Sequence, residues 1–350
     1  IAGMALDKFG GKKSLFAGAL ILGIGCLLFL ASSYSGGVAG RLLQGAGCAF
    51  AFPGCVYLAS KGFSSKSLAT AVGFTQCIGM LGGTAGQFIV GPWVEEGVNI
   101  DTFWLWSGII TVITAFCLFL VIPGEKQSEV QPGDAVKKVG YLEPYKIVFK
   151  NPQSWLCGII SGLLFAPTTI FAMTWGVAFF EKDKGFMFHD AAITSAMVAF
   201  GWVFGCPLLG FITDKIGRRK PVLIGGAILM IFSFLQLLYL PELYPAKISM
   251  FIFGLGSGAA MIPYSIIKEA NPDYVKGSAT GAINFITFGV TTLVSPVFSR
   301  WFGKSLEVSS GEMHFQSSLL FWIAGIVLAV LISFLLKETG SKAQLQTLNA

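Results

Sequence analysis

One sequence pattern occurs twice in this chain, and each copy lies between two long apolar runs. The first copy occupies residues 3–13 and the second occupies residues 210–220, which is 207 positions later. Both copies read glycine, three variable residues, Asp-Lys, one variable residue, glycine, one variable residue and two basic residues. The repeat indicates two related halves, and paired halves that move against each other are typical of membrane transport proteins.

The composition indicates a membrane protein. Apolar residues make up 54% of the chain, charged residues 12%, and the mean hydropathy is +0.73. Soluble domains carry about 25% charged residues, so we predict an all-α polytopic membrane protein. The seven cysteines lie inside apolar runs without metal-ligand spacing. We read them as small buried hydrophobic residues and expect no metal and no cofactor.

Apolar runs of about 20 residues predict helices that cross a bilayer. We place ten of them near residues 14–33, 38–60, 68–92, 102–122, 154–180, 191–212, 221–240, 246–268, 278–300 and 317–336. Residues 1–6 resemble the last turn of a further helix. If the two pattern copies hold equivalent places, the first helix and most of the second are missing, and the full protein has twelve helices.

The two halves also match outside the repeated pattern. Pro53 and Pro263, Lys66 and Lys276, and the Ala-Thr pairs at 69–70 and 279–280 all align at an offset of 210. We therefore predict an incomplete N-terminal bundle at 1–122, a cytoplasmic linker at 123–153, a C-terminal bundle at 154–336 and a cytoplasmic tail at 337–350. Within the linker, residues 141–150 could form a short surface helix.

The basic residues predict the orientation in the membrane. The loops at 7–13, 61–67, 123–153, 213–220 and 268–277, together with the tail, hold 18 of the 24 Lys and Arg residues. These loops are expected to face the cytoplasm, and both termini with them. We expect a bacterial inner membrane. The net charge of +6 is then a topology signal, and we expect no nucleic-acid partner.

At the repeated pattern the chain resembles the major facilitator superfamily, whose loop between helices two and three carries this signature. Residues 41–47, Arg-Leu-Leu-Gln-Gly-Ala-Gly, resemble its helix-four signature R-x-x-Q-G-x-G. The resemblance implies two six-helix bundles around a central cavity, a substrate site near the midplane and alternating access. The helix-five antiporter signature is incomplete, because Gln87 stands where the family has proline.

The repeated pattern predicts a gate that acts without touching substrate. Gly3 and Gly210 allow close helix approach, and Asp7 and Asp214 could accept hydrogen bonds at a facing helix N-terminus. Glu269 could pair with Arg219 or Lys220, or could simply be a solvated helix end. Gly10 and Gly217 are the second glycines of the two copies and complete the candidate gate. The basic residues of the pattern could pair with acids or anionic lipids, or serve only as positive charge in a tight loop: Lys8, Lys12, Lys13, Lys215, Arg219 and Lys220.

Arg41 is the charge that lies clearly inside a predicted helix. A charge embedded in the membrane is costly and indicates function. Arg41 could bind a substrate carboxylate or phosphate, modulate a proton site, or snorkel to the outer surface. Further polar or aromatic residues could line the cavity, although helix-to-helix hydrogen bonding is the alternative for each: Gln44, Tyr57, Gln76, Trp175, Tyr264 and Asn284.

These features favour secondary active transport of a small polar solute, an organic anion or zwitterion such as an organic acid or small peptide. Coupling to protons is left open, because no Asp or Glu lies at mid-span in the ten predicted helices. No phosphate-binding loop and no catalytic arrangement is present, so we expect no enzyme. We expect a monomer. A drug efflux antiporter and a transport-inactive membrane sensor are the alternatives.

Overall fold

The structure is a computed structural model that describes residues 2–31, 33–64, 66–86, 97, 99–124, 143–308 and 312–342, without the side chains of 303–308 and 312–315. In these residues ten helical segments are long and apolar enough to span a membrane. They are Ala2–Ala31, Tyr34–Gly62, Leu68–Ala85, Ile100–Val121, Pro152–Lys182, Phe188–Ile216, Lys220–Tyr239, Ala246–Glu269, Asp273–Phe302 and Gln316–Ser333. Each overlaps one predicted span. The predicted all-α polytopic class is confirmed.

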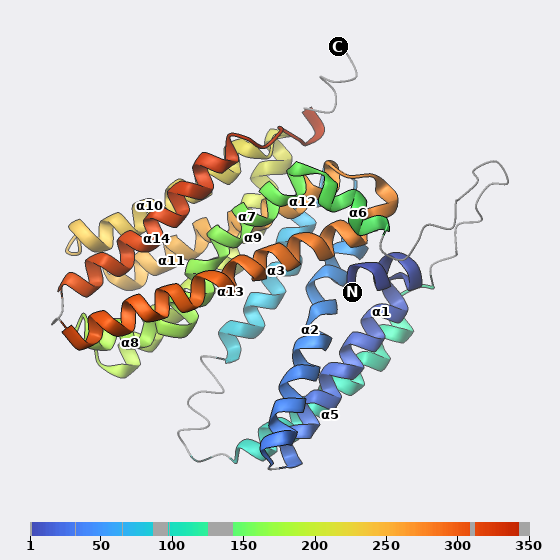
Figure 1. Ribbon diagram of the computed structural model, residues 1–350, viewed down its shortest axis with the longest axis horizontal. Helices are drawn as coiled ribbons and strands as arrows, with labels where there is room; N and C mark the ends of the chain where they lie inside the picture. The colour runs from blue at the N-terminus through green and yellow to red at the C-terminus, as the bar shows by residue number, and fades with distance from the viewer. Residues whose placement is uncertain are drawn as a thin grey trace. The chain divides into compact units, whose positions relative to one another are not determined.

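The residues of the chain group into two compact units. Unit 1 comprises Ile1–Gly62, Val90–Asn151 and Asn271–Ala282. It contains α1 (Ala2–Leu27), α2 (Tyr34–Gly62), α5 (Ile100–Val121), α6 (Glu143–Lys150) and the start of α13 (Lys276–Val308). α1 packs along both α2 and α5, as Figure 1 shows. Gly18 and Gly47 bring the α1 and α2 backbones close together.

The first copy of the repeated pattern lies at a break inside α1. Gly10 has φ 79° and ψ 168° there, and it is buried. L-residues with a side chain rarely adopt this conformation, so the pattern needs glycine at this position. The break separates a short segment before Gly10 from the long segment that reaches Leu27.

Unit 2 comprises Phe63–Ile89, Pro152–Ala270 and Ile283–Ala350. It contains α3 (Leu68–Ala85), α7 (Pro152–Ala166), α8 (Gly176–Lys182), α9 (Phe188–Ile216), α10 (Lys220–Tyr239), α11 (Ala246–Ser257), α12 (Ile262–Glu269) and α14 (Glu312–Ser333), with the rest of α13. α9 packs against α3 and α11. The helix backbones come so close at these crossings that a side chain would clash with the neighbouring helix. Glycine occupies such positions at Gly73, Gly205 and Gly210.

A π-helical segment (Pro167–Trp175) joins α7 to α8 inside one membrane span. π-helices are rare and occur mostly as short insertions at functional sites. Side chains of α9 bond to this segment: the Trp202 indole N–H donates to the Thr168 hydroxyl over 3.0 Å, and the Ser195 hydroxyl donates to the Ala172 carbonyl oxygen. Thr174 Oγ1 donates to the Thr169 carbonyl oxygen over 2.8 Å.

The contact units do not follow the predicted domain borders. Residues 63–89 group with unit 2 and residues 271–282 group with unit 1, so the division into bundles at 1–122 and 154–336 stays a prediction. The surface helix expected at 141–150 corresponds to α6 (Glu143–Lys150). Linker residues 125–142, tail residues 343–350 and Gln87 lie outside the described residues.

Candidate gate and cavity residues

Asp7 caps the N-terminus of α13 in unit 1. Its Oδ1 accepts the Gly277 N–H at 2.8 Å, and its Oδ2 accepts the Ser278 N–H at 2.7 Å and the Ser278 hydroxyl at 2.6 Å. The first N–H groups of a helix have no partner inside the helix, and the helix dipole favours a negative charge there. Asp7 therefore occupies the kind of position that the sequence predicted.

Asp214 makes the related contact in unit 2, at the N-terminus of α3. Its Oδ2 accepts the Thr70 N–H at 2.7 Å and the Thr70 hydroxyl at 2.6 Å. Its Oδ1 accepts Arg219 Nη1 at 2.5 Å. Both aspartates thus join a residue of one predicted bundle to a residue of the other.

Arg219 is the centre of a buried ionic cluster. Its side chain is 1% exposed and donates through Nη2 and Nε to both Glu269 oxygens, at 2.6 and 3.2 Å, besides its bond to Asp214. Burial acts to lower the pKa of the guanidinium, but the bonds and charges of Glu269 and Asp214 raise it overall. Glu269 is 4% exposed, so it is paired and buried rather than a solvated helix end.

The residue equivalent to Arg219 in the first copy has different surroundings. Lys12 Nζ lies 4.6 Å from the centre of the Phe119 ring. The last turn of α2 contains Ala59, Ser60 and Lys61 before its final residue Gly62, where the second half has Glu269. The two copies therefore share the aspartate cap, but only the second forms an Asp–Arg–Glu cluster among the described residues.

The other predicted gate residues divide into glycines with a clear structural role and basic residues at the surface. A side chain on Gly3 would meet the Gly277 carbonyl oxygen and the Tyr145 hydroxyl, and one on Gly210 would meet the Ala69 backbone. Gly217 ends α9 with φ 73°. Lys8, Lys13 and Lys215 are exposed.

The segment after α14 forms hydrogen bonds with the second copy of the repeated pattern. Glu338 Oε1 accepts the backbone N–H groups of Arg219 and Lys220 at 2.7 and 3.1 Å. In return, Lys220 Nζ donates to the carbonyl oxygens of Phe334 and Leu336 at 3.1 and 2.7 Å. Sequence reasoning did not identify Glu338, Thr70 or Ser278 as functional candidates. The Ala-Thr repeat could have indicated Thr70, but the expected equivalent of Thr70 was Thr280 rather than Ser278.

Arg41 lies on α2 in unit 1 beside two stacked aromatic rings. The centres of the Phe29 and Trp104 rings are 4.4 Å apart. Arg41 Cζ lies 5.1 Å from the centre of the Phe29 ring and 5.5 Å from that of the Trp104 ring. Nη1 donates to Gln44 Oε1 at 3.1 Å. Among the described residues no carboxylate pairs with Arg41. The candidates Arg41 and Gln44 are thus in direct contact, next to a cavity of about 460 Å³.

Two more cavity candidates meet in unit 2. The Tyr264 hydroxyl donates to Asn284 Oδ1 at 2.9 Å, with Tyr264 buried and Asn284 half-buried. Trp175, at the end of the π-helix, packs edge-on against Phe302 at 5.2 Å. Tyr57 is buried in unit 1, with Lys61 Nζ 4.5 Å from its ring centre. Gln76 is half-buried, and the structure does not join it to the other candidates.

The sequence matches the Major Facilitator Superfamily over residues 1–296. The chain belongs to this family. It is therefore a multi-pass membrane protein of secondary transport that takes small-molecule substrates, and not an enzyme. Its resemblance to the family at the repeated pattern is confirmed.

Curated relatives and solved structures agree with this family. The bacillibactin exporter of Bacillus subtilis is 26% identical, over 85% of this chain and 76% of that protein. The cis,cis-muconate transport protein of Acinetobacter baylyi is 23% identical (94% and 80%), and a probable sulfoacetate transporter of Cupriavidus necator is 25% identical (94% and 79%). The fold matches a structure of XylE with a TM-score of 0.73 and 16% identity, over 97% of this chain and 83% of that one.

Proposed function

We propose that this protein transports a small organic anion across a bacterial inner membrane by alternating access. The observation that carries the proposal is that Arg41 has no carboxylate partner among the residues that the structure describes. The guanidinium lies within a membrane-spanning helix, against aromatic rings and a neutral amide. A charge at such depth needs water, a partner or a ligand, and an anionic substrate would supply the opposite charge.

The chemistry of Arg41 suits a carboxylate or sulfonate. Arg presents a planar set of N–H donors that binds two oxygens at once. One of these donors is used by Gln44, which also fixes the direction of the side chain. Two of the relatives compared above are named for organic anions, cis,cis-muconate and sulfoacetate, and this supports the proposal.

The test is uptake into proteoliposomes with a panel of dicarboxylates, sulfonated carboxylates and neutral sugars. We expect kcat/KM for the best anion to fall at least about tenfold in Arg41→Gln, because one charge-assisted contact is worth about 1.5–3 kcal/mol. Arg300→Gln, which removes an exposed arginine on α13, is the control and should match wild type. Preferred uptake of neutral sugars, with no effect of Arg41→Gln, would contradict the anion proposal.

The same assay separates transport from sensing. Anion binding without uptake under any imposed gradient would favour a transport-inactive sensor. Proton coupling is tested by applying a pH gradient to vesicles that already take up the anion. Outward movement of amphipathic drugs in place of anion uptake would instead favour the efflux antiporter.

A further inference from the structure

A polar chain in unit 1 links Arg41 to a cysteine on the neighbouring helix. Arg41 Nη1 donates to Gln44 Oε1 over 3.1 Å, and Gln44 Nε2 donates to Cys26 Sγ over 3.6 Å. Gln44 and Cys26 are buried, with 9% and 7% of their surface exposed. The chain therefore runs from α2 to α1 and ends on a thiol that has no part in the transport site described above.

The chemistry of these three groups favours one direction of the Gln44 amide. A guanidinium only donates hydrogen bonds, so the amide must turn its carbonyl oxygen toward Arg41. The NH₂ group of the amide then faces α1 and needs an acceptor, which is the Cys26 sulfur. The opposite direction would bring two donors, the guanidinium and the NH₂ group, against each other. Cys26 thus stabilises the direction in which Gln44 can accept from Arg41.

Two glycines make this contact between the helices possible. A side chain on Gly25 would meet the backbone nitrogen of Gln44. A side chain on Gly40 would meet the carbonyl oxygen of Gly25. The α1 and α2 backbones therefore approach each other closely at this level, which brings the Cys26 sulfur within reach of the Gln44 amide.

This arrangement leaves one edge of the Arg41 guanidinium open to a ligand. Nη1 is bonded to Gln44, and the Phe29 and Trp104 rings lie beside the guanidinium. Among the residues that the structure describes, Arg41 Nε and Nη2 have no hydrogen-bond acceptor. These two atoms form an edge that can bind both oxygens of a carboxylate. The cavity of about 460 Å³ beside Arg41 gives a ligand room to reach it.

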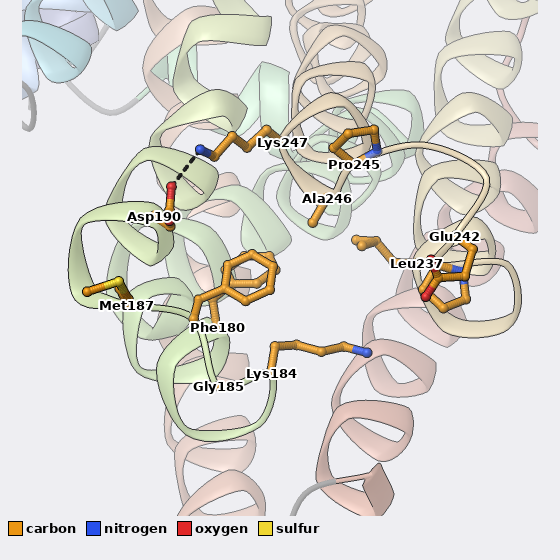
Figure 2. A pocket seen from close by; sticks show the side chains of 12 residues that line it. Phe180, Lys184, Gly185, Met187, Asp190, Leu237, Glu242, Pro245, Ala246 and Lys247 are labelled. Atoms are coloured by element: carbon orange, nitrogen blue, oxygen red, sulfur yellow. Dashed lines mark hydrogen bonds and ion pairs between the residues drawn. The ribbon is translucent and has the colours of Figure 1, made fainter.

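A larger cavity in unit 2, of about 840 Å³, shows a different arrangement of charge. Asp190 Oδ1 accepts Lys247 Nζ there over 2.7 Å, as the dashed line in Figure 2 shows. An ammonium that is paired with a carboxylate attracts a further anion less strongly, because the two charges largely cancel at a distance. The partner of Arg41, by contrast, is a neutral amide, which directs the guanidinium without cancelling its charge.

We propose that Cys26 is a positioning residue of the anion site. Its thiol fixes the Gln44 amide, and the amide presents the Nε–Nη2 edge of Arg41 to the carboxylate of the substrate. This inference rests on the proposed function, in which Arg41 binds the transported anion. It goes beyond that function in two respects. A thiol that touches no substrate sets the affinity for it, and the side chain at position 44 has to be neutral.

The first test measures anion uptake by the full chain in proteoliposomes. We expect Cys26→Ala to raise KM about fivefold with little change in kcat, because Gln44 loses the acceptor that fixes its direction. Cys26→Ser should return KM to within about twofold of wild type, because a hydroxyl oxygen also accepts the amide N–H. Cys117→Ala removes an exposed cysteine on α5. It is the matched control and should leave KM unchanged.

The second test addresses the charge at position 44. Gln44→Glu hardly changes the shape of the side chain, but its carboxylate would pair with Arg41 and cancel the charge that attracts the anion. We expect kcat/KM for the anion to fall at least about tenfold, as in Arg41→Gln. Gln44→Leu removes the amide without adding a charge, so its loss should be smaller than that of Gln44→Glu.

An unchanged KM in Cys26→Ala would overturn the proposal. A rise in KM that Cys26→Ser does not reverse would also overturn it, because the thiol would then act through packing alone. Equal losses in Gln44→Glu and Gln44→Leu would contradict the need for a neutral side chain. Arg41→Gln separates this inference from the proposed function. If Arg41→Gln impairs uptake and Cys26→Ala does not, only the inference fails, whereas normal uptake in Arg41→Gln contradicts the proposed function itself.

Discussion

The two aspartates that occupy the same place in the repeated pattern make different contacts. Asp7 binds the start of α13 through Gly277 and Ser278, whereas Asp214 binds Thr70 and also holds Arg219. Loss of one partner from a buried ionic cluster is costly, because it leaves the other charges without compensation. The second copy is therefore the more sensitive of the two.

We predict that Asp7→Ala and Asp214→Ala both impair anion uptake while the protein still inserts in the membrane, with the larger loss in Asp214→Ala. Removal of a partner from a buried pair costs about 3–5 kcal/mol, whereas loss of a helix cap costs about 1 kcal/mol. Uptake per inserted molecule measures the effect. Normal rates in both variants would exclude a gating role for the aspartates.

Thr70→Val and Ser278→Ala form a matched pair, because each removes a hydroxyl from an aspartate and leaves the backbone cap in place. A hydrogen bond to a charged group contributes about 1.5–3 kcal/mol, so both variants should lower the thermal unfolding temperature in detergent and slow uptake in part. Thr114→Val is the control, since Thr114 donates only within its own helix. If the unfolding temperature and the uptake rate fell no further than in Thr114→Val, the two hydroxyls would be dispensable.

The sequence predicted the kind of contact that the two aspartates make, but it did not predict which residues they bind. The fixed spacing of Gly and Asp predicted a carboxylate at a helix N-terminus, and both carboxylates are found there. The partner residues depend on how far each helix slides past its neighbour, which the offset of 210 does not record. This is why Ser278 takes the place expected for Thr280. Glu338 escaped prediction because it follows the last span, in a segment that composition alone describes as a polar tail.

At the scale of helices, the segment after α14 ties two helix ends to each other. Glu338 caps the start of α10, and Lys220 at that start donates to the carbonyl oxygens of Phe334 and Leu336, just after the end of α14. Gln153 adds a third attachment at the start of α7, where its Oε1 accepts the Lys337 N–H at 2.8 Å. The position of Arg219 is thus supported from its backbone as well as from its guanidinium.

We predict that Glu338→Ala speeds amide hydrogen exchange at residues 219–223, because the first N–H groups of α10 lose their acceptor. The loss of a cap should lower stability by about 1 kcal/mol. Lys337→Ala is the control, since only the backbone of Lys337 makes this attachment. Unchanged exchange in Glu338→Ala would show that water replaces the carboxylate without cost.

At the scale of the molecule, the number and type of membrane spans in the described part of the chain followed from the sequence, because a run of about 20 apolar residues has few other solutions. The sequence did not predict the two compact units. Residues 63–89 come from the predicted N-terminal bundle, but they group with residues of the predicted C-terminal bundle. Periodicity also failed to show the π-helix at Pro167–Trp175. Its residues Thr168 and Ala172 bond to Trp202 and Ser195, which are distant in sequence.

The predicted orientation can be tested in whole cells. In a variant without its seven native cysteines, Met187→Cys should react with a membrane-impermeant maleimide from outside. Lys215→Cys should react only after permeabilisation. Both positions are exposed, so accessibility within the protein does not limit labelling. The reverse pattern would invert the predicted topology.

The π-helical segment between α7 and α8 has a mechanical consequence. A π-turn contains one residue more than an α-turn, so this stretch stores a surplus residue that can pass toward either end without breaking the span. Each such transfer would turn only the residues that the surplus passes, by about 100° about the helix axis. Trp175 would then exchange one set of neighbours for another by a screw motion about the helix axis. Such a shift would change the face that the middle of this span presents while both of its ends keep their places.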